Sequence, residues 1–392
     1  MAGSKIFIDR DKLSPRYIPD TLPHRTSQIH TLLSLYDDIF EDISKVFLRV
    51  TQVIGNIGTG KTCTAIKFGE ELQKKALDRK INLQHAYLNC KIEGTSRFVL
   101  YGNLLRKIAP ELSTRSLSPE EMLRQLIDYL QNEEKYVLIT VDEVDYFFKR
   151  SKEHLAYDLT RLPELTPGKT TPVIGELLIS RDLQFHKNLD PSEISTLGRN
   201  IIEFPQYNAK QIKDIIIQRV DKAFKSGVLD DGVIDYICDV TAQSPINGDI
   251  RLALDLLLYS GILAENQGFN RILPDHARKV YGQTHPTITT QDIISLGGTE
   301  KLVLLGLVRS LKSENTPYIS LSKIREAYEV ICEEYKVKPV KEIEEPVQDL
   351  FDRGIVDMKS LTEFGVSGVS AKDLENFLSG ITQRLRHDLS DV

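Results

Sequence analysis

The 392-residue chain has no apolar run of about 18 residues, the length that a membrane-spanning helix requires. Its cysteines, Cys63, Cys90, Cys238 and Cys332, include no C-x-x-C pair, which argues against both a cysteine zinc site and a disulfide framework. The first residues, MAGSKIFIDRDKL, do not follow the pattern of a signal peptide. We therefore expect a soluble, cytoplasmic protein with reduced thiols and no membrane partner.

A net positive charge is also missing. The chain has 56 acidic and 50 basic residues, which leaves a formal net charge of −6. An acidic chain does not attract nucleic acid as a whole, so any DNA contact has to come from local basic patches. No internal repeat or low-complexity tract is present, and the length predicts two or three domains.

The clearest motif is GNIGTGKT at Gly55–Thr62, which has the spacing G-x-x-x-x-G-K-[ST] of a phosphate-binding loop. An apolar segment that predicts a strand precedes it, and Thr64–Leu77 predicts a helix after it. In this context, backbone N–H groups surround phosphates at a helix N-terminus. Lys61 would contact the outer phosphates, and Thr62 would offer its hydroxyl to Mg²⁺. The residues predicted to bind ATP or ADP here are Gly58, Thr59, Gly60, Lys61, Thr62 and Cys63.

A second motif lies at the end of another apolar segment. Tyr136–Val141 predicts a buried strand that ends in Asp142-Glu143. An acidic residue at the end of a core parallel strand can hold the water shell of Mg²⁺, so Asp142 and Thr62 are the predicted metal residues. Glu143 is the candidate general base for the attacking water.

Residues 1–204 alternate strand-like segments with amphipathic helices, which predicts an α/β fold with a helix-covered parallel sheet. The predicted strands are Val46–Ile54, Gln84–Leu88, Tyr136–Val141, Pro172–Ile179 and Asn200–Phe204.

Residues 205–283 are helical throughout, and the stretch THPTITTQD marks a boundary near 284–292. The predicted helices before it are Ala209–Lys225, Asp231–Thr241 and Asp249–Glu265. After it come Thr299–Ser310, Ser320–Tyr335 and Pro339–Arg353, and Ser320 is the expected N-cap of the second of these helices. A strand at 354–358 and a Gly/Ser turn at 364–369 follow. Three helices and a β-ribbon predict a winged helix-turn-helix domain at 284–392.

Three further stretches carry a resemblance to a family. They are LSPRYIPDTLPHR at 13–25, LDP at 189–191 running on to IEFPQY at 202–207, and GDIRLALD at 248–255. Together with the phosphate loop and VDEVD, they resemble the archaeal replication initiators of the origin-recognition/cell-division-control ATPase family. The resemblance spans nearly the whole chain and is thinnest in the last hundred residues.

The resemblance implies an AAA+ base at 1–204, a helical lid at 205–283 and a winged helix at 284–392, with ATP bound between base and lid. It implies apolar contact of Ile18 and Pro19 with the adenine, while Arg25 anchors that loop. Tyr207 and Arg219 match positions that close over the nucleotide. Arg251 matches the second sensor, which reaches toward the γ-phosphate as an always-charged, bidentate donor. The implied catalytic set is Lys61, Asp142, Glu143 and Arg251.

Two departures from the family pattern concern hydrolysis. Arg181 stands where the family usually has a first-sensor Asn, and it could contact phosphate or pair with Asp142 or Glu143. The segment Ser192–Ser195 after Asp190-Pro191 has no basic residue, although the family commonly has one that acts on a neighbour's ATP. Loss of such a finger lowers turnover by orders of magnitude, so slow hydrolysis is expected.

The third departure concerns DNA, because the predicted wing tip and the candidate recognition helix at 340–346 carry few basic residues and several glutamates. The candidate phosphate contacts are Arg115, Lys336, Lys338, Lys341, Lys359 and Lys372. For the lysines, the alternative is an ordinary solvated surface. Arg115 lies in the region 108–117, where the family inserts a DNA-contacting helix. For Arg115, the alternative is a plain loop that precedes a helix capped by Ser118.

The sequence therefore predicts an ATP-binding replication initiator that recognises double-stranded origin DNA, with slow ATP hydrolysis as a switch. Its further expected partners are another initiator paralogue and the replicative helicase. One alternative is a nucleotide-locked DNA-binding regulator, or a partner of another initiator, that turns over little ATP. A weaker alternative is an unrelated AAA+ ATPase whose C-terminal domain binds protein.

Overall fold

The computed structural model describes residues 4–43, 47–168, 170–286, 288–366 and 368–390, the last nine of these by backbone alone. Val46 and Ser367, which belong to predicted elements, lie outside the described residues. The chain forms two compact units, one of Ile18–Gln206 and one of Met1–Tyr17 with Tyr207–Val392. Each unit is described by itself.

The unit 18–206 is built on a parallel sheet whose strand order is β2-β3-β4-β1-β5. The strands are β1 (Arg49–Ile54), β2 (Leu83–Asn89), β3 (Tyr136–Asp142), β4 (Val173–Ser180) and β5 (Ile201–Glu203). Within the described residues, each strand falls at a predicted segment. The α/β fold with a parallel sheet is confirmed.

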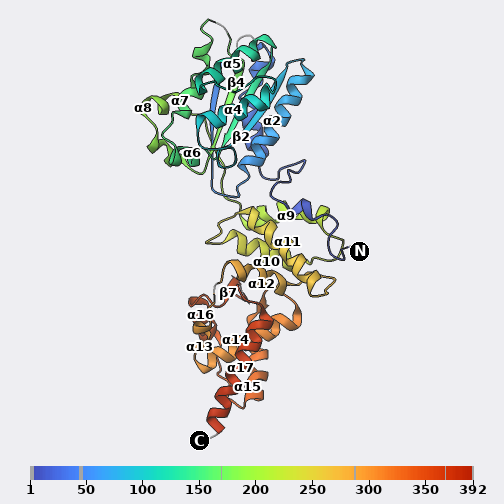
Figure 1. Ribbon diagram of the computed structural model, residues 1–392. Coiled ribbons are helices and arrows are strands. Elements are labelled where there is room, and N and C mark those ends of the chain that lie inside the picture. The colour runs from blue at the N-terminus through green and yellow to red at the C-terminus, as the bar shows by residue number, and fades with distance from the viewer. Residues whose placement is uncertain (1–3, 44–46, 169, 287, 367, 391–392) are drawn as a thin grey trace. The chain divides into compact units, whose positions relative to one another are not determined.

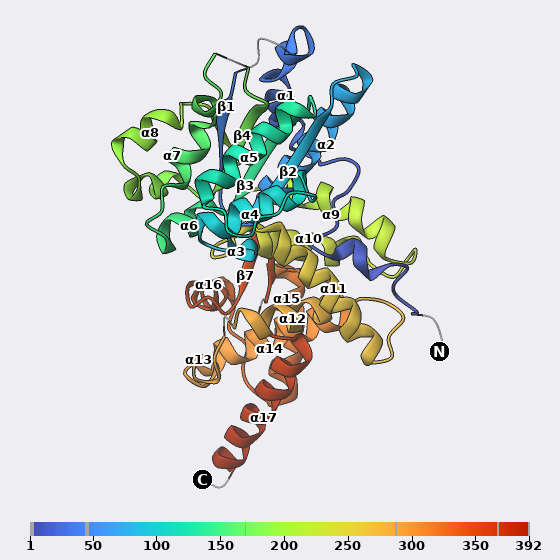
Figure 2. The ribbon, with the colours of Figure 1, turned by 45° about the horizontal axis from the view of Figure 1, so that its top comes forward.

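Helices cover both faces of this sheet (Figure 2), because parallel strands that are apolar on both sides need two covering layers. On one face, α1 (Thr26–Ser34) and α2 (Lys61–Asp78) pack over the inner strands in one apolar cluster. A larger cluster on the other face includes α4 (Arg97–Ile108) and α5 (Pro119–Asn132). The shorter helices of this unit are α3 (Cys90–Glu93), α6 (Val144–Arg150), α7 (Leu155–Thr160) and α8 (Pro191–Thr196).

The region 109–117, where a helix is expected in the family, forms no helix in the structure. It is a loop that ends at Ser118, whose side chain caps α5 in a capping box with Glu121. The plain-loop alternative therefore describes the backbone around Arg115.

The other unit (Figure 1) contains the helical lid and the winged helix. The lid helices are α9 (Ala209–Ala223), α10 (Asp231–Ala242), α11 (Ile250–Asn266) and α12 (Pro274–Thr284). Residues 4–17 pack with these helices, whereas the sequence placed them in the base. The reason is apolar burial, since Ile6, Phe7 and Leu13 lie in the lid core and Phe7 stacks on Phe224.

The winged helix carries a small antiparallel sheet in the order β6-β8-β7, formed by β6 (Ile319–Ser320), β7 (Asp357–Ser360) and β8 (Glu363–Gly365). Its helices are α13 (Thr290–Ile294), α14 (Gly298–Glu314), α15 (Leu321–Tyr335), α16 (Glu344–Asp352) and α17 (Ala371–Ser390). The predicted winged helix is confirmed, and Ser320 caps α15 as expected. The third helix begins at Glu344 rather than Pro339, because the Val340 N–H donates to the Tyr328 hydroxyl (3.2 Å) and holds the connection outside the helix.

A buried arginine ties the lid to the winged helix within this unit. Arg278 of α12 is 1% exposed and donates to the carbonyl oxygens of Val366 (3.1 Å), Thr316 (3.1 Å) and Pro317 (2.8 Å). Gly282 of α12 lies so close to Gly368 that an added Cβ would sit 2.0 Å from the Gly368 carbonyl oxygen. The two parts therefore form one packed body. No helix of the described residues is long and apolar enough to cross a bilayer.

Candidate functional site

The phosphate-loop motif lies between β1 and α2, as its spacing predicts. Gly60 precedes α2 with φ 85°, a conformation that favours glycine. A Cβ on Gly55 would lie 2.5 Å from the Phe204 carbonyl oxygen, so only glycine fits this close approach. Lys61 Nζ donates to the carbonyl oxygens of Gly55 (2.5 Å) and Asn56 (2.7 Å), which holds its charge over the loop.

Asp142 is the centre of a hydrogen-bonded group at the end of β3. Its Oδ2 accepts from the Thr62 hydroxyl (2.6 Å) and the Tyr87 hydroxyl (2.8 Å), and its Oδ1 accepts from the Glu143 N–H (2.8 Å). Burial raises the pKa of Asp142, and the bonds from Thr62 and Tyr87 oppose that rise. Carboxylate and hydroxyl oxygens are the ligands that Mg²⁺ prefers, so Thr62 and Asp142 fit the predicted metal position.

Glu143 directly follows Asp142 and adopts a left-handed backbone conformation with φ 58°. Its Oε2 lies 2.7 Å from Nζ of Lys91, at the start of α3. In this conformation the candidate base is held by Lys91.

Arg181 follows β4, next to the loop, and its carbonyl oxygen accepts from the Gly55 N–H (3.1 Å). The sequence suggested Asp142 or Glu143 as partners for its guanidinium. The structure gives a different one, because Arg181 Nε lies 3.9 Å from Oδ2 of Asp145 in α6. Arg181, which stands at the expected first-sensor position, therefore faces a nearby aspartate.

Arg25 links the IPDTLPHR segment to the phosphate loop inside the unit 18–206. It is buried, and it donates to the carbonyl oxygens of Thr59 (2.9 Å) and Pro205 (2.8 Å). Pro19 is buried and Ile18 is half-buried. A cavity of about 460 Å³ lies beside the loop, with Gly55, Asn56, Arg181, Phe204 and Pro205 in its lining.

The remaining predicted nucleotide residues belong to the other unit. Tyr207 is buried, with Gly248 packed against its backbone. Arg219 donates to the carbonyl oxygens of Lys12 (3.1 Å) and Tyr17 (3.0 Å), so it holds the N-terminal segment on the lid. Arg251 lies in the first turn of α11, and its exposed side chain makes no ion pair or hydrogen bond with any residue that the structure describes.

The predicted DNA residues are exposed and scattered over several elements. Lys336, Lys338 and Lys341 lie on or beside the connection from α15 to α16, and Lys372 begins α17. Lys359 of β7 lies over the Tyr318 ring and 3.9 Å from Asp235 of the lid. Arg115 lies in the loop before α5. Arg115 thus belongs to the unit 18–206, and the five lysines belong to the other unit.

Sequence reasoning missed three residues at the end of β2. Tyr87 donates to Asp142, Asn89 is paired in register with Asp142, and Lys91 holds Glu143. The missed signal was strand order, because the carboxyl ends of neighbouring parallel strands meet at one edge of the sheet.

Comparison with known proteins identifies the family. Family models match at residues 49–175 (AAA domain), 213–282 (Cdc6 AAA+ ATPase-type lid domain) and 291–364 (CDC6 C-terminal winged helix domain). An ORC1-type DNA replication protein of Pyrococcus horikoshii is 32% identical over 371 residues, which cover 93% of this chain and 86% of that protein. The chain belongs to the ORC1-type DNA replication protein family.

Two solved structures agree with this assignment. Cdc6p from Pyrobaculum aerophilum has a TM-score of 0.79 and 27% identity, covering 97% of this chain and 99% of that chain. The Aeropyrum pernix ORC1 protein, solved in complex with DNA, has a TM-score of 0.63 and 26% identity, and the match covers 96% of this chain and 98% of that chain. The predicted ORC1/Cdc6-type family and AAA+ fold are confirmed, and the family implies nucleotide binding.

Proposed function

We propose that this ORC1/Cdc6-type protein binds ATP–Mg²⁺, recognises double-stranded DNA at a replication origin, and uses slow ATP hydrolysis as a switch. The observation that carries the proposal is the hydrogen bond from Thr62 to the buried Asp142 at the mouth of the phosphate loop. It joins a hydroxyl next to Lys61 in the chain to a carboxylate oxygen, and a nucleotide triphosphate with its metal requires oxygen ligands and a lysine of this kind.

The residues around the loop have distinct proposed roles. Lys61 exchanges the carbonyl oxygens of Gly55 and Asn56 for phosphate oxygens when the nucleotide binds. Asp142 and Thr62 would hold Mg²⁺, which would neutralise charge on the phosphates. Glu143, once separated from Lys91, accepts a proton from the attacking water.

Slow turnover is supported by three features of the unit 18–206. Lys91 pairs with the candidate base Glu143, and Arg181 faces Asp145. The third feature is α8, because its residues Ser192–Ser195 include no basic side chain that could serve a neighbour's ATP.

DNA binding is supported by the winged helix and by the relative that was solved with DNA. Lys336, Lys338 and Lys341 are exposed on or beside the α15–α16 connection, and no ion pair with another described residue involves them, so they are candidates for phosphate contacts. Glu344 and Glu345 open α16 and would repel phosphates, although Arg325 pairs with Glu344. We therefore propose that the α15–α16 connection, rather than the first turn of α16, lies against the phosphate backbone.

Nucleotide gating of DNA affinity is the finer part of the proposal. Arg251 is exposed at the start of α11, where a guanidinium is available to contact a γ-phosphate. Arg278 joins the lid to the winged helix, so a movement of the lid would carry the winged helix with it. Loading of the replicative helicase and pairing with an initiator paralogue are the expected later steps.

Footprinting on genomic origin DNA with ATP, with ADP and without nucleotide tests the proposal. We expect protection of a defined site that changes in strength or extent between the nucleotide states. The same footprint in every state would refute gating, and no footprint in any state would refute origin binding. The variant Arg251→Gln should bind nucleotide and give one footprint in all states.

The alternative is a nucleotide-locked regulator that turns over almost no ATP, and the Lys91–Glu143 pair is the observation that favours it. Single-turnover hydrolysis by wild type and Glu143→Gln separates the two functions. A measurable wild-type rate that Glu143→Gln abolishes supports a weak ATPase. Equal, near-zero rates for both proteins favour the regulator.

A further inference from the structure

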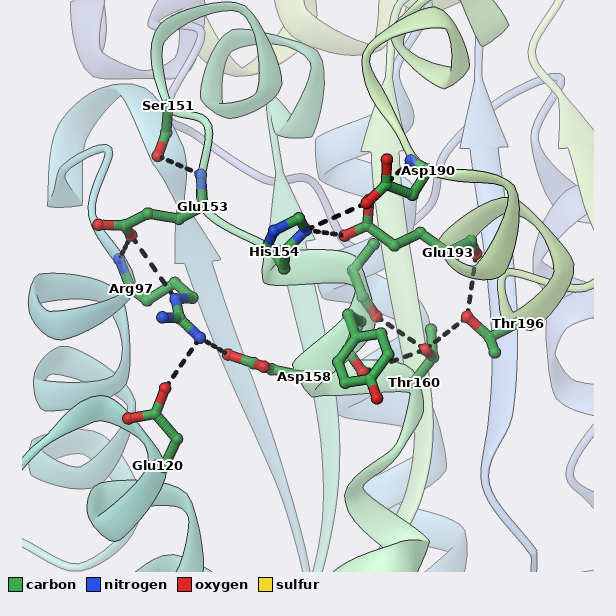
Figure 3. A network of polar contacts seen from close by, with 12 residues as sticks. Arg97, Glu120, Ser151, Glu153, His154, Asp158, Thr160, Asp190, Glu193 and Thr196 are labelled. Atoms are coloured by element: carbon green, nitrogen blue, oxygen red, sulfur yellow. Dashed lines mark hydrogen bonds and ion pairs between the residues drawn. The ribbon is translucent and has the colours of Figure 1, made fainter.

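Away from the phosphate loop, three side chains that can bind metal converge between two short helices (Figure 3). His154 directly precedes α7, while Asp190 directly precedes α8 and Glu193 lies in its first turn. The two helices are linked by a hydrogen bond between the hydroxyls of Thr160 and Thr196 (2.8 Å). The three side chains therefore meet on a fixed pair of elements.

The spacing of the donor atoms suits one small cation. His154 Nδ1 lies 3.5 Å from a carboxylate oxygen of Glu193 and 3.8 Å from one of Asp190, and all three donors lie within 4.8 Å of one another. Ligands at about 2.0–2.2 Å from a tetrahedral Zn²⁺ are about 3.3–3.6 Å apart. Small rotations of His154 and Asp190, whose side chains are 58% and 65% exposed, reach that geometry.

A second observation points to a missing ligand. The Glu193 side chain is 4% exposed, and its Oε2 accepts the Asp190 N–H (3.0 Å). Its buried Oε1 accepts no hydrogen bond from any part of the chain that the structure describes, and it faces His154. A buried carboxylate oxygen that accepts no hydrogen bond is costly, and a bound cation would remove that cost.

We propose that His154, Asp190 and Glu193 bind one divalent transition metal ion of the Zn²⁺ class. One imidazole and two carboxylates suit Zn²⁺, Co²⁺ or Mn²⁺ better than Mg²⁺, which favours oxygen ligands alone. The site borders a cavity of about 460 Å³ that is also lined by Lys149, Arg150 and Lys152. These positive charges favour water or a small anion as the fourth ligand. The ion ties the start of α7 to α8.

Cobalt titration of the full chain tests the site. Protein stripped with a chelator, without nucleotide, is titrated with Co²⁺ while the visible absorption of the ion is recorded. We expect one bound ion per chain in wild type. The variants His154→Gln and Glu193→Gln should each weaken binding at least about tenfold. The controls His30→Gln and Glu164→Gln alter exposed residues of the same unit and should bind as wild type does.

Other binding sites and misfolding are separated within the same experiment. Co²⁺ at the phosphate loop would be lost in Asp142→Asn, whereas the proposed site keeps its ion in that variant. Glu193→Gln retains an oxygen to accept the Asp190 N–H, and circular dichroism checks that each variant is folded. The proposal is overturned if wild type shows no saturable binding, or if a folded His154→Gln binds Co²⁺ with wild-type affinity. A charge-transfer band typical of thiolate ligands would also overturn it.

Discussion

A glutamate within β4 gives the sharpest prediction about stability. Glu176 is fully buried, and neither of its carboxylate oxygens accepts a hydrogen bond from the described residues. Burial disfavours the charged form and raises the pKa of Glu176 from 4.5 to about 8. The prediction is that replacing Glu176 with glutamine stabilises the protein, increasingly so as the pH rises.

Proton binding to the folded and unfolded chains determines the sign. Between pH 4.5 and about 8, the folded chain holds a proton at Glu176 that the unfolded chain has lost. The free energy of unfolding therefore falls as the pH rises, by about 1.4 kcal/mol per pH unit from this group. The contribution of protonated Glu176 to the stability of the wild type is fully present below pH 4.5 and is lost above about pH 8. The full difference is about 5 kcal/mol as an upper bound, since water entry and relaxation reduce it.

Urea unfolding of wild type and Glu176→Gln, followed by circular dichroism from about pH 5 to about pH 9, measures this difference. Comparing the two proteins at each pH cancels the other titrating groups. We expect the advantage of Glu176→Gln to grow through the neutral range and level off above about pH 8. The exposed control Glu133→Gln should show no such trend. An advantage that is independent of pH would refute the raised pKa and the unpartnered burial from which it follows.

Other predictions concern the site, the lid and DNA. Lys91→Met should raise the single-turnover rate of ATP hydrolysis several-fold, because it frees Glu143 from the ion pair. The gain should vanish in the double variant Lys91→Met/Glu143→Gln. An unchanged rate in Lys91→Met would mean that the ion pair does not restrain the base. Arg278→Met should lower the free energy of unfolding by at least about 2 kcal/mol, because three carbonyl oxygens, two of them in buried hydrogen bonds, lose their donor. The exposed control Arg271→Met should cost less than about 1 kcal/mol in the same denaturation assay. Lys336→Gln and Lys338→Gln should each reduce the magnitude of the slope of log DNA affinity against log salt concentration by about 0.9. The control Lys74→Gln on α2 should leave the slope unchanged. A wild-type slope in either lysine variant would exclude that phosphate contact.

Elements with a strong local signal were predictable from the sequence. The five strands of the sheet are short apolar segments between helices, and the phosphate-loop spacing fixed the junction of β1 and α2. Ser118 and Ser320 cap helices where the sequence predicts caps. These features depend on residues within a few positions of one another, so local pattern was sufficient to find them.

Features that depend on distant residues were not predictable in the same way. Nothing local to Ile6 and Phe7 indicates that they pack in the lid core, more than two hundred residues along the chain. The start of α16 depends on a bond from Val340 to Tyr328 of the preceding helix. The partners of Glu143 and Arg181 depend on which strand ends are neighbours and on side-chain rotamers, neither of which the motif spacing specifies.

These distant contacts bear directly on how the proposed switch would work. Lys91 lies in α3, just past the end of β2, so the base is restrained by the segment that follows the neighbouring strand and not by the VDEVD motif itself. Whatever displaces Lys91 from Glu143 would therefore start hydrolysis without changing the phosphate loop. In the other unit, Arg278 joins the lid to the winged helix, so under the proposed function a movement of the lid would carry the winged helix with it. Under the proposed function, the lifetime of the Lys91–Glu143 pair sets how long ATP persists, and that time limits how long the winged helix keeps its ATP-bound orientation.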